Sequence, residues 1–204
     1  EVQPLLENDY KHLKSLGVDS ILVYQETYDK QVYKQHHLKG KKSNFDYRLA
    51  TPERAANAGI DKIGLGCLLG LADWRIDVIK LAQHLQYLQK YYWQSRYALS
   101  FPRLRPCEGN KNDSQHVTEQ QLLQIICAFR LFAPDVEISL STRETAYFRD
   151  NAMALGITSM SAGSVTQPGG YANKTEQLEQ FSIDDDRAPK TVANKIMTNG
   201  YQVI

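Results

Sequence analysis

Short apolar runs along the chain alternate with longer segments whose apolar residues recur at helical spacing. Runs of this length are typical of buried strands, and they cover residues 20–24, 60–71 (with a turn), 97–99, 136–140 and 157–161. The longer segments predict helices over residues 5–16, 51–58, 73–93, 118–131 and 189–199, with one more through Phe148 that ends near Gly156. About five strands that alternate with helices favour a parallel α/β architecture, either an open sheet or a barrel.

Local signals add detail to this pattern. Thr118 and Gln121 have the spacing of a capping box, which predicts the start of a helix. Residues 29–44 are polar and rich in lysine, which indicates either a long loop or a helix over the end of the first strand. Gly64 and Gly66 in the second strand allow a ligand or another backbone to come close.

Polar and charged residues follow four of the five apolar runs, and nothing comparable precedes them. They are Gln25 and Glu26, Arg103 and Arg105, Ser141, Arg143 and Glu144, and Ser161 and Ser164. Because the carboxyl ends of parallel strands meet at one edge, these residues predict one shared site. Guanidinium groups offer forked donors to carboxylates and phosphates, so an anionic ligand is expected. The alternative is that Arg103 and Arg105 lie on a solvated loop.

The charge balance and the cysteine positions exclude several classes of function. The chain has 24 Lys plus Arg against 23 Asp plus Glu, which gives no electrostatic argument for nucleic acid. No apolar run approaches the roughly 18 residues that a membrane span needs, and no signal-peptide pattern opens the chain. Cys67, Cys107 and Cys127 lie far apart, which fits a reducing, cytoplasmic setting and excludes a site of neighbouring thiolates.

Common catalytic motifs are absent from the sequence. It has neither a Gly-x-Ser-x-Gly nucleophile elbow nor a Walker-type phosphate loop, and Gly64-Leu65-Gly66 lacks the spacing of a dinucleotide fingerprint. Residues 162–164 suit a phosphate cradle in an aldolase-like barrel, but no Schiff-base lysine stands at a recognisable strand end. The residues alone therefore indicate a small-molecule α/β enzyme whose catalytic residues are unknown.

Five ordered segments resemble the 2-iminoacetate synthases, the tyrosine lyases of thiamine thiazole synthesis. The segments are VYQETY (23–28), DKIGLG (61–66), SFPRLRP (100–106), LSTRE (140–144) and SAGS (161–164). This family uses S-adenosylmethionine (SAM) and a [4Fe–4S] cluster, and its fold is a (β/α) TIM-type barrel. The resemblance implies that a 5′-deoxyadenosyl radical takes a hydrogen from tyrosine, whose cleavage gives 2-iminoacetate (dehydroglycine) and 4-methylphenol. It also implies thiazole synthase and an electron donor such as flavodoxin as partners.

One feature departs from this radical SAM family. The family binds its cluster through Cys-x-x-x-Cys-x-x-Cys, which is absent here. A family barrel has eight strands, and about five are predicted. The simplest explanation is that the chain is the C-terminal part of a longer enzyme and is inactive alone; the other is a natural cluster-free homologue. On the first explanation, residues 1–171 form the C-terminal part of the barrel, and residues 172–204 form a tail and helix of the biotin/thiamin-synthesis-associated region.

The resemblance assigns residues to the cofactor. Glu26 is similar to the acidic residue that contacts the SAM amino group or ribose, and Arg48 to the arginine that takes the SAM carboxylate. Gly64 and Gly66 are similar to the strand that lies against adenine. The alternative for Arg48 is an ordinary ion pair with Asp46 or Glu53.

A second set would face tyrosine: Ser100, Arg103, Arg105, Ser141, Arg143 and Glu144. Arg143 is the first choice for the tyrosine carboxylate, ahead of Arg103 and then Arg105, because it follows a buried strand with Ser141 and Glu144 beside it. Arg103 and Arg105 are expected to point the same way, as alternate residues of an extended segment do. The alternative for Glu144 is to accept amides at the start of the next helix.

A different class of function also fits the sequence. The chain is then a non-catalytic binding or assembly module that docks the thiazole synthase. In both cases a partial barrel has open edges at its first and last strands, from which self-association is expected.

Overall fold

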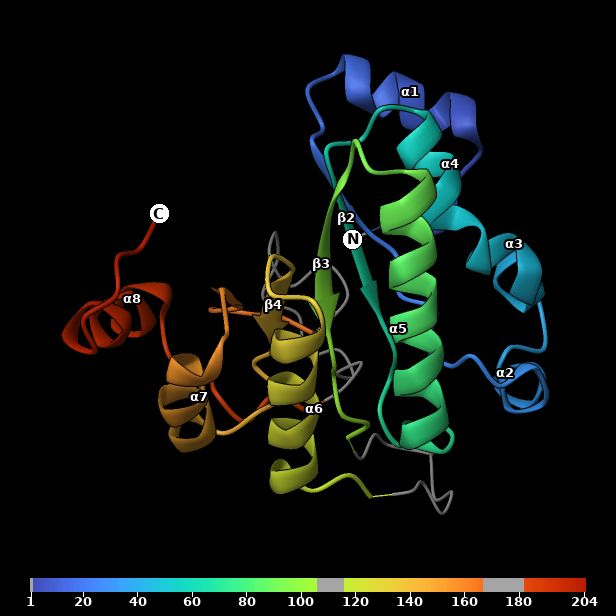
Figure 1. Ribbon diagram of the computed structural model, residues 1–204. Coiled ribbons are helices and arrows are strands. Elements are labelled where there is room, and N and C mark those ends of the chain that lie inside the picture. The colour runs from blue at the N-terminus through green and yellow to red at the C-terminus, as the bar shows by residue number, and fades with distance from the viewer. Residues whose placement is uncertain (1, 106–115, 167–181) are drawn as a thin grey trace.

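The computed structural model describes residues 2–105, 116–166 and 182–204, and its strands and helices alternate as predicted. Five parallel strands form one sheet in the order β1-β2-β3-β4-β5 (Figure 1). They are β1 (Ser20–Leu22), β2 (Lys62–Gly66), β3 (Arg96–Ser100), β4 (Glu137–Leu140) and β5 (Ser159–Met160). Every neighbouring pair is parallel, so the carboxyl ends of all five strands lie at the same end of the sheet.

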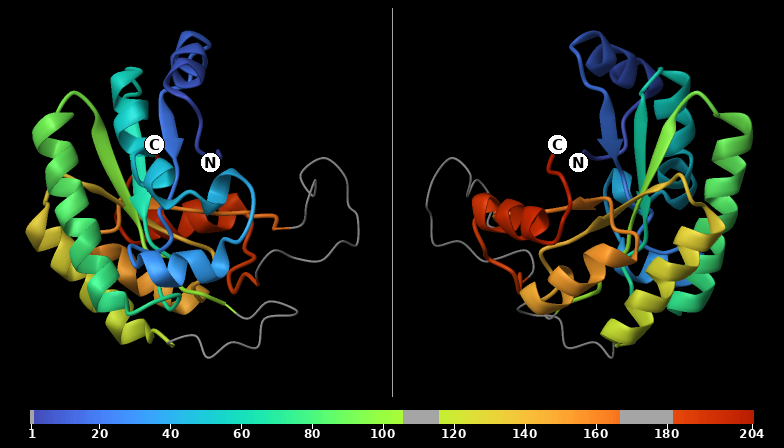
Figure 2. Two further views of the ribbon diagram at one scale, coloured as in Figure 1. Left: turned by 90° about the vertical axis from the view of Figure 1, so that its right-hand side faces the viewer. Right: turned by 60° about the vertical axis from the view of Figure 1, so that its left-hand side comes forward.

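The helices leave the carboxyl ends of the strands and return to their amino ends. Helices α4, α5 and α6 cover one face of the curled sheet, as both views in Figure 2 show. The helices are α1 (Glu7–Ser15), α2 (Lys30–His36), α3 (Phe45–Leu49), α4 (Thr51–Asn57), α5 (Trp74–Tyr91), α6 (Glu119–Phe132), α7 (Ala146–Ala152) and α8 (Pro189–Thr198), with short 3-10 helices η1 (Lys41–Ser43) and η2 (Met153–Leu155).

The core lies between this layer of helices and the sheet. Ile63, Leu99 and Ile138 are buried in the three central strands, where they join one cluster with Leu81 and Leu85 of α5. These leucines stand four residues apart and therefore share one face of the helix. Strands covered in this way read as continuous apolar runs, which is why they could be recognised in the sequence.

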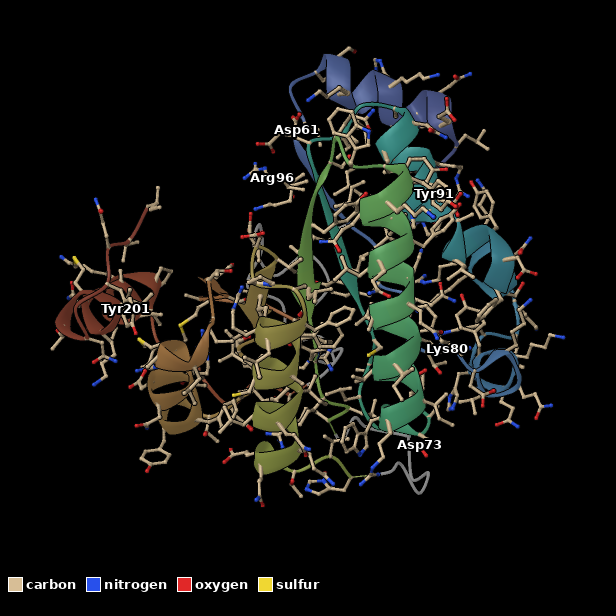
Figure 3. All side chains as sticks on the ribbon, in the orientation of Figure 1. Asp61, Asp73, Lys80, Tyr91, Arg96 and Tyr201 are labelled. Carbon is tan, nitrogen blue, oxygen red and sulfur yellow. The ribbon has the colours of Figure 1, made fainter. Side chains whose placement is uncertain are left out.

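The sheet is a partial barrel, which confirms the expected fold class. Strands β1 and β5 stand at the two ends of the strand order, and each pairs with one neighbour within the described parts of the chain. Figure 3 gives the direction of the sheet: Asp61 and Arg96 mark the amino ends of β2 and β3, and Asp73 lies at the opposite end, where α5 begins. The carboxyl ends of the strands therefore lie toward Asp73.

Helix boundaries follow the local signals. The Thr118 hydroxyl accepts a hydrogen bond from the Gln121 amide at 3.2 Å, and the Gln121 side chain accepts one from the Thr118 amide at 2.9 Å. This reciprocal pair is the predicted capping box. Within the polar segment 29–44, Asp29 accepts bonds from two amides and starts α2, so the helical alternative was correct there. The separate helix α3 was not predicted.

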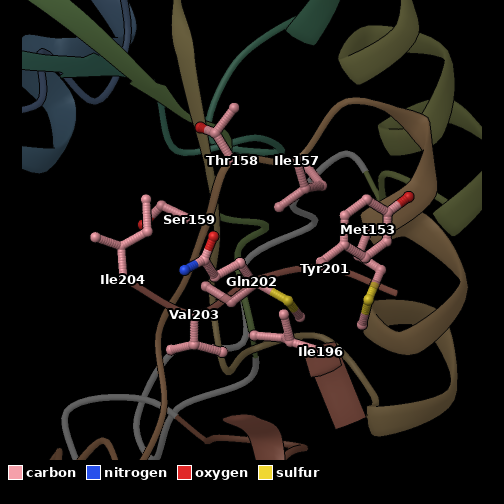
Figure 4. Close-up of a pocket in the computed structure, with 10 residues that line it drawn as sticks. Met153, Ile157, Thr158, Ser159, Ile196, Tyr201, Gln202, Val203 and Ile204 are labelled. Carbon is pink, nitrogen blue, oxygen red and sulfur yellow. The ribbon is translucent and has the colours of Figure 1, made fainter. Parts of the chain in front are cut away.

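The C-terminal residues 201–204 lie next to the edge strand β5. The proposed domain boundary between residues 171 and 172 falls outside the described residues. Beyond the edge strand β5, a hollow of about 440 Å³ lies next to the C-terminal residues 201–204 (Figure 4). Apolar side chains such as Ile157, Ile196 and Val203 line it. Across the described segments, no helix has the length and apolar character needed to cross a membrane.

Candidate functional site

A cavity of about 630 Å³ lies at the carboxyl ends of the strands. Four strand exits contribute to it, and its lining is rich in hydroxyl groups. The lining residues are Tyr24, Glu26, Lys42, Ser100, Pro102, Ser139, Ser141, Thr142, Arg143, Ser161, Ser164, Val165 and Thr166. The shared site that the parallel topology predicts is therefore present as a space large enough for a small ligand.

Glu26 brings a carboxylate to this cavity among three basic side chains. Its Oε1 lies 2.7 Å from Nζ of Lys42 and 3.1 Å from Nη2 of Arg48, and its Oε2 lies 2.8 Å from Nε2 of His37. Arg48 is buried and also donates from Nε to the Tyr24 carbonyl at 2.7 Å. Arg48 thus pairs with Glu26 rather than with Asp46 or Glu53, the alternatives considered from the sequence.

The basic residues around Glu26 are delivered by the segment that contains α2, η1 and α3. The fully buried Tyr33 donates a hydrogen bond from its hydroxyl to the Lys42 carbonyl at 2.6 Å, and its ring packs edge-on against His37. Desolvation by burial lowers the pKa of His37, against the opposing effect of Glu26. His37 therefore favours the neutral form, which can still donate one hydrogen bond to Glu26.

Arg103 and Glu144 form a buried ion pair beside the cavity. Nε of Arg103 donates to Oε1 of Glu144 at 2.9 Å, Nη2 contacts Oε2, and Nη1 donates to the Val117 carbonyl at 2.8 Å. Arg105 reaches the same carboxylate, with its Nη2 3.4 Å from Oε2. Arg103 and Arg105 therefore point the same way, as their spacing predicts, and Glu144 binds side chains rather than helix amides.

Arg143 and Ser141 differ from that pair because both line the cavity itself. The Ser141 hydroxyl accepts a hydrogen bond from the Arg143 amide at 3.2 Å. The Arg143 guanidinium donates to the Arg103 carbonyl at 3.3 Å, and the Arg143 carbonyl accepts from Arg105. Arg143 is thus held by the neighbouring strand exit while its side chain borders the cavity. Ser100, at the end of β3, lines the same space.

The two glycines of β2 are required by the protein itself. A Cβ atom on Gly64 would lie 2.7 Å from the Leu22 side chain. A Cβ atom on Gly66 would lie 2.5 Å from the Ser100 carbonyl and 2.9 Å from the Tyr24 ring. Close approach of neighbouring strands therefore explains both glycines, and neither residue is among those that line the cavity.

The thiols of the described residues do not fit an iron–sulfur cluster. Cys67 is fully buried, and burial, with a smaller contribution from Asp77, raises the pKa of its thiol. No group of three or more His, Cys, Asp and Glu side chains within the described ranges could hold a metal ion. Cys107 lies outside those ranges.

Sequence reasoning missed several residues of the site. Lys42 and His37 contact Glu26, and Thr142 and Tyr24 line the cavity. Lys42 belongs to a lysine-rich run, a pattern that solvated loops also show. Its contact with Glu26 joins residues that are far apart in the sequence. Thr142 sits between Ser141 and Arg143, so its position in the matching segment was the available signal.

A second buried acid lies behind the cavity. Asp77, in the first turn of α5, accepts hydrogen bonds at Oδ1 from the Thr27 hydroxyl at 3.0 Å and from the Tyr28 amide at 2.7 Å. Its Oδ2 is buried with no hydrogen-bond partner in the described structure. Desolvation outweighs both hydrogen bonds and raises the pKa of Asp77 to about 6.

The raised pKa of Asp77 predicts a pH-dependent contribution to stability. A raised folded-state pKa favours folding when the acid is neutral, and this contribution is lost as the pH rises through about 6. The Asp77→Asn variant has no titrating group at this position. The difference in the free energy of unfolding, variant minus parent, should therefore increase by about 1–3 kcal/mol as the pH rises from 4 to 8. Urea unfolding of both proteins across this range measures the gain. Asp46→Asn, at an exposed ion pair, is the control; an equal gain there would contradict the prediction.

Comparisons with known proteins identify the family and the fold of this chain. The model of the biotin and thiamin synthesis associated domain matches residues 100–202, half of the chain. The chain therefore belongs to this domain family. Over its whole length it is 56% identical to the 2-iminoacetate synthases of Salmonella typhimurium and Escherichia coli. The aligned region is 54% of each, so the chain spans about half the length of these curated relatives.

Solved structures share the fold. A crystal structure of HydG, a maturase of the [FeFe]-hydrogenase, superimposes with a TM-score of 0.87 at 32% identity and covers 97% of this chain and 43% of that one. HydG from Carboxydothermus hydrogenoformans matches with the same score at 34% identity, over 97% of this chain and 46% of that one. Methylornithine synthase shares the fold, with a TM-score of 0.68 at 19% identity. The match covers 97% of this chain and 56% of that one.

Proposed function

We propose that this chain is part of a longer radical SAM tyrosine lyase, which cleaves tyrosine to 2-iminoacetate and 4-methylphenol for the thiazole of thiamine. One observation carries the proposal: a single cavity brings Glu26, from the first strand exit, together with Ser141 and Arg143, from the fourth. Those residues belong to the segments that resemble the lyases, and the names of the relatives at 56% identity support the same role.

SAM would lie on the Glu26 side of the cavity. The Glu26 carboxylate suits the ligand's ammonium or ribose hydroxyls, and the basic side chains around it suit a carboxylate, so an amino-acid group fits both charges. Arg48 is buried against Glu26 and would fix the direction of the Glu26 carboxylate. The same guanidinium would also bind the SAM carboxylate. Bound next to a reduced cluster, SAM supplies the family's hydrogen-abstracting chemistry. The cluster itself would be held outside this chain's described residues.

Tyrosine would lie on the opposite side, against the exits of β3 and β4. The Arg143 guanidinium would bind the tyrosine carboxylate with two parallel hydrogen bonds, and the Ser141 and Ser100 hydroxyls would hold its polar groups. Arg103, Arg105 and Glu144 would act one layer further out, because Arg103 pairs with Glu144 and Arg105 pairs with both Glu144 and Asp184. This arrangement keeps Arg143 as the first choice for the carboxylate and fixes the substrate relative to SAM.

The partners follow from the same proposal. The imine product is unstable in water, so a thiazole synthase would take it directly, and an electron donor such as flavodoxin would reduce the cluster. Both belong to the cytoplasm of a bacterial cell. The second candidate function, a non-catalytic module that docks the thiazole synthase, is favoured by one observation: the described residues lack cluster ligands. Iron–sulfur absorbance together with tyrosine cleavage after anaerobic reconstitution of the complete enzyme would exclude that second candidate.

Replacing Arg143 by lysine in the complete enzyme tests the proposed substrate contact. Lysine keeps the positive charge but loses the fork, so tyrosine cleavage should fall by about tenfold or more, while cluster content and SAM affinity stay unchanged. Single-turnover assays should show 5′-deoxyadenosine without matching 4-methylphenol. Lys39→Ala, an exposed position on the segment near the cavity, is the control. If Arg143→Lys cleaves tyrosine at the parent's rate and affinity, the contact is wrong.

The open edges of the sheet lead to a proposal about assembly. β1 and β5 each pair on one side only within the described chain, and exposed backbone donors and acceptors there can bind another strand. We expect the 204-residue chain to self-associate as its concentration rises. Light scattering over a wide concentration range measures this, and a constant monomer mass at every concentration would contradict it.

A further inference from the structure

The loop that carries Glu26 is attached to helix α5 from the side away from the cavity. Asp77 binds the hydroxyl of Thr27 and the amide of Tyr28, and the Thr27 hydroxyl accepts a further bond from the Asp29 amide at 3.0 Å. Two turns along the same helix, Nδ1 of His84 lies 2.9 Å from the Tyr28 hydroxyl. Residues 77 and 84 share one face of α5, so the loop is held at two points of one rigid element.

Glu26 needs such support because of its backbone conformation. Its φ is +74°, the one positive value for a residue other than glycine among the described residues. The left-handed region disfavours side chains with a Cβ, and it persists where surrounding contacts enforce it. Part of this enforcement comes from the segment that follows β2, since the Leu68 amide donates to the Glu26 carbonyl at 2.7 Å. The rest comes from the contacts of Thr27 and Tyr28.

The burial of Asp77 is costly for the fold. The residue is 1% exposed, its Oδ2 has no partner in the described structure, and the neighbouring Cys67 thiol offers no charge to offset it. Asp29 and Asp73 are the other acids that act on it, and both disfavour its ionised form. A buried carboxylate with this surplus of unfavourable interactions is retained where it does something that an apolar residue cannot.

We propose that Asp77 is a positioning residue, which acts through Thr27 to set the direction of the Glu26 carboxylate at the cavity. This inference rests on the proposed function, because it assumes that Glu26 binds the SAM amino group. Neither Asp77 nor Thr27 lines the cavity, so the effect on the ligand passes through the loop. The Thr27 hydroxyl is the link: it donates to Asp77 and accepts from Asp29, so it joins the helix α5 to the start of α2.

The matched pair Thr27→Val and Thr27→Ser tests the link in the 204-residue chain. Valine keeps the shape and removes the hydroxyl, whereas serine retains it. Hydrogen exchange at the amides of Tyr28 and Asp29 should accelerate on the order of tenfold or more in the valine variant and stay near the parent's rate in the serine variant. The Asp77→Asn variant keeps an acceptor at Oδ1, so its amide exchange rates should stay near the parent's, as in Thr27→Ser. Equal exchange in all three variants would overturn the proposal.

SAM affinity of the complete, cluster-loaded enzyme gives the functional readout. Thr27→Val should weaken SAM binding by about tenfold, with KM for SAM raised more than kcat is lowered, and Thr27→Ser should restore the affinity. Added to Glu26→Gln, the valine substitution should cause no further loss, because both act at one carboxylate. If Glu26→Gln itself leaves the SAM affinity unchanged, the proposed function is wrong at this residue. If Glu26→Gln weakens SAM binding and Thr27→Val does not, the positioning role of Asp77 is wrong.

Discussion

Replacing Asp185 by alanine is expected to lower the free energy of unfolding by about 3–5 kcal/mol, because it leaves the buried Arg149 guanidinium without its carboxylate partner. Both side chains of this ion pair are fully buried. Arg149 also donates to the Ser161 carbonyl, and Arg187 pairs with both Asp185 and Asp150. The pair thus joins α7, the exit of β5 and the segment before α8.

The pKa of Asp185 indicates the same dependence on its basic partners. Burial raises the pKa of Asp185, but the hydrogen bonds of Arg187 and the charge of Arg149 outweigh it, and the net pKa is lowered. A lowered pKa means that the stability is present above the ordinary range for Asp and is lost as the pH falls below it. Thermal and urea unfolding of Asp185→Ala measure the loss. Asp186→Ala, at the exposed neighbouring position, is the control; equal effects of the two would refute the account.

Replacing Glu144 by alanine should be comparably damaging, again by about 3–5 kcal/mol. Glu144 is 1% exposed, and it accepts hydrogen bonds from the buried Arg103 and from Arg105. Without it, the buried Arg103 guanidinium loses its close counter-charge, whereas Arg105 keeps Asp184 at 2.9 Å. Glu144→Gln retains an acceptor and should lose less, because the shape and one hydrogen bond remain.

Glu119 provides the matched control for Glu144. Its carboxylate lies 3.9 Å from Nη2 of Arg103, but its side chain is 47% exposed, so the pair is screened by water. Glu119→Ala should therefore cost less than about 1 kcal/mol. Unfolding by urea separates the two variants, and a small loss for Glu144→Ala would show that Arg103 finds another partner or leaves the interior.

The fold could be predicted from the sequence because its signals are local. Strands such as β3, where four successive residues from Tyr97 to Ser100 are buried, read as short apolar runs. The Thr118–Gln121 capping box marks the start of α6 within four residues. The position of the cavity could also be predicted, because parallel strands place all their carboxyl ends at the same end of the sheet.

The pairing of charges within the site could not be predicted in the same way. Arg103 and Glu144 lie 41 residues apart, and the sequence offers several other acids that Arg103 could reach. The same holds for Lys42 with Glu26 and for Arg149 with Asp185, where the chain must fold before the partners meet. Asp77 gave no signal, because an acid in the first turn of a helix is ordinary in any sequence. Thr27 had only its place in the matching segment 23–28 as a signal.

A crystal structure of the complete enzyme with SAM and tyrosine tests the central claim most directly. The account predicts both ligands in the cavity between the exits of β1 and β4, with the SAM amino group or ribose on Glu26 and the tyrosine carboxylate within hydrogen-bonding distance of the Arg143 guanidinium. Tyrosine bound away from Arg143, or SAM bound without contact to Glu26, would contradict it.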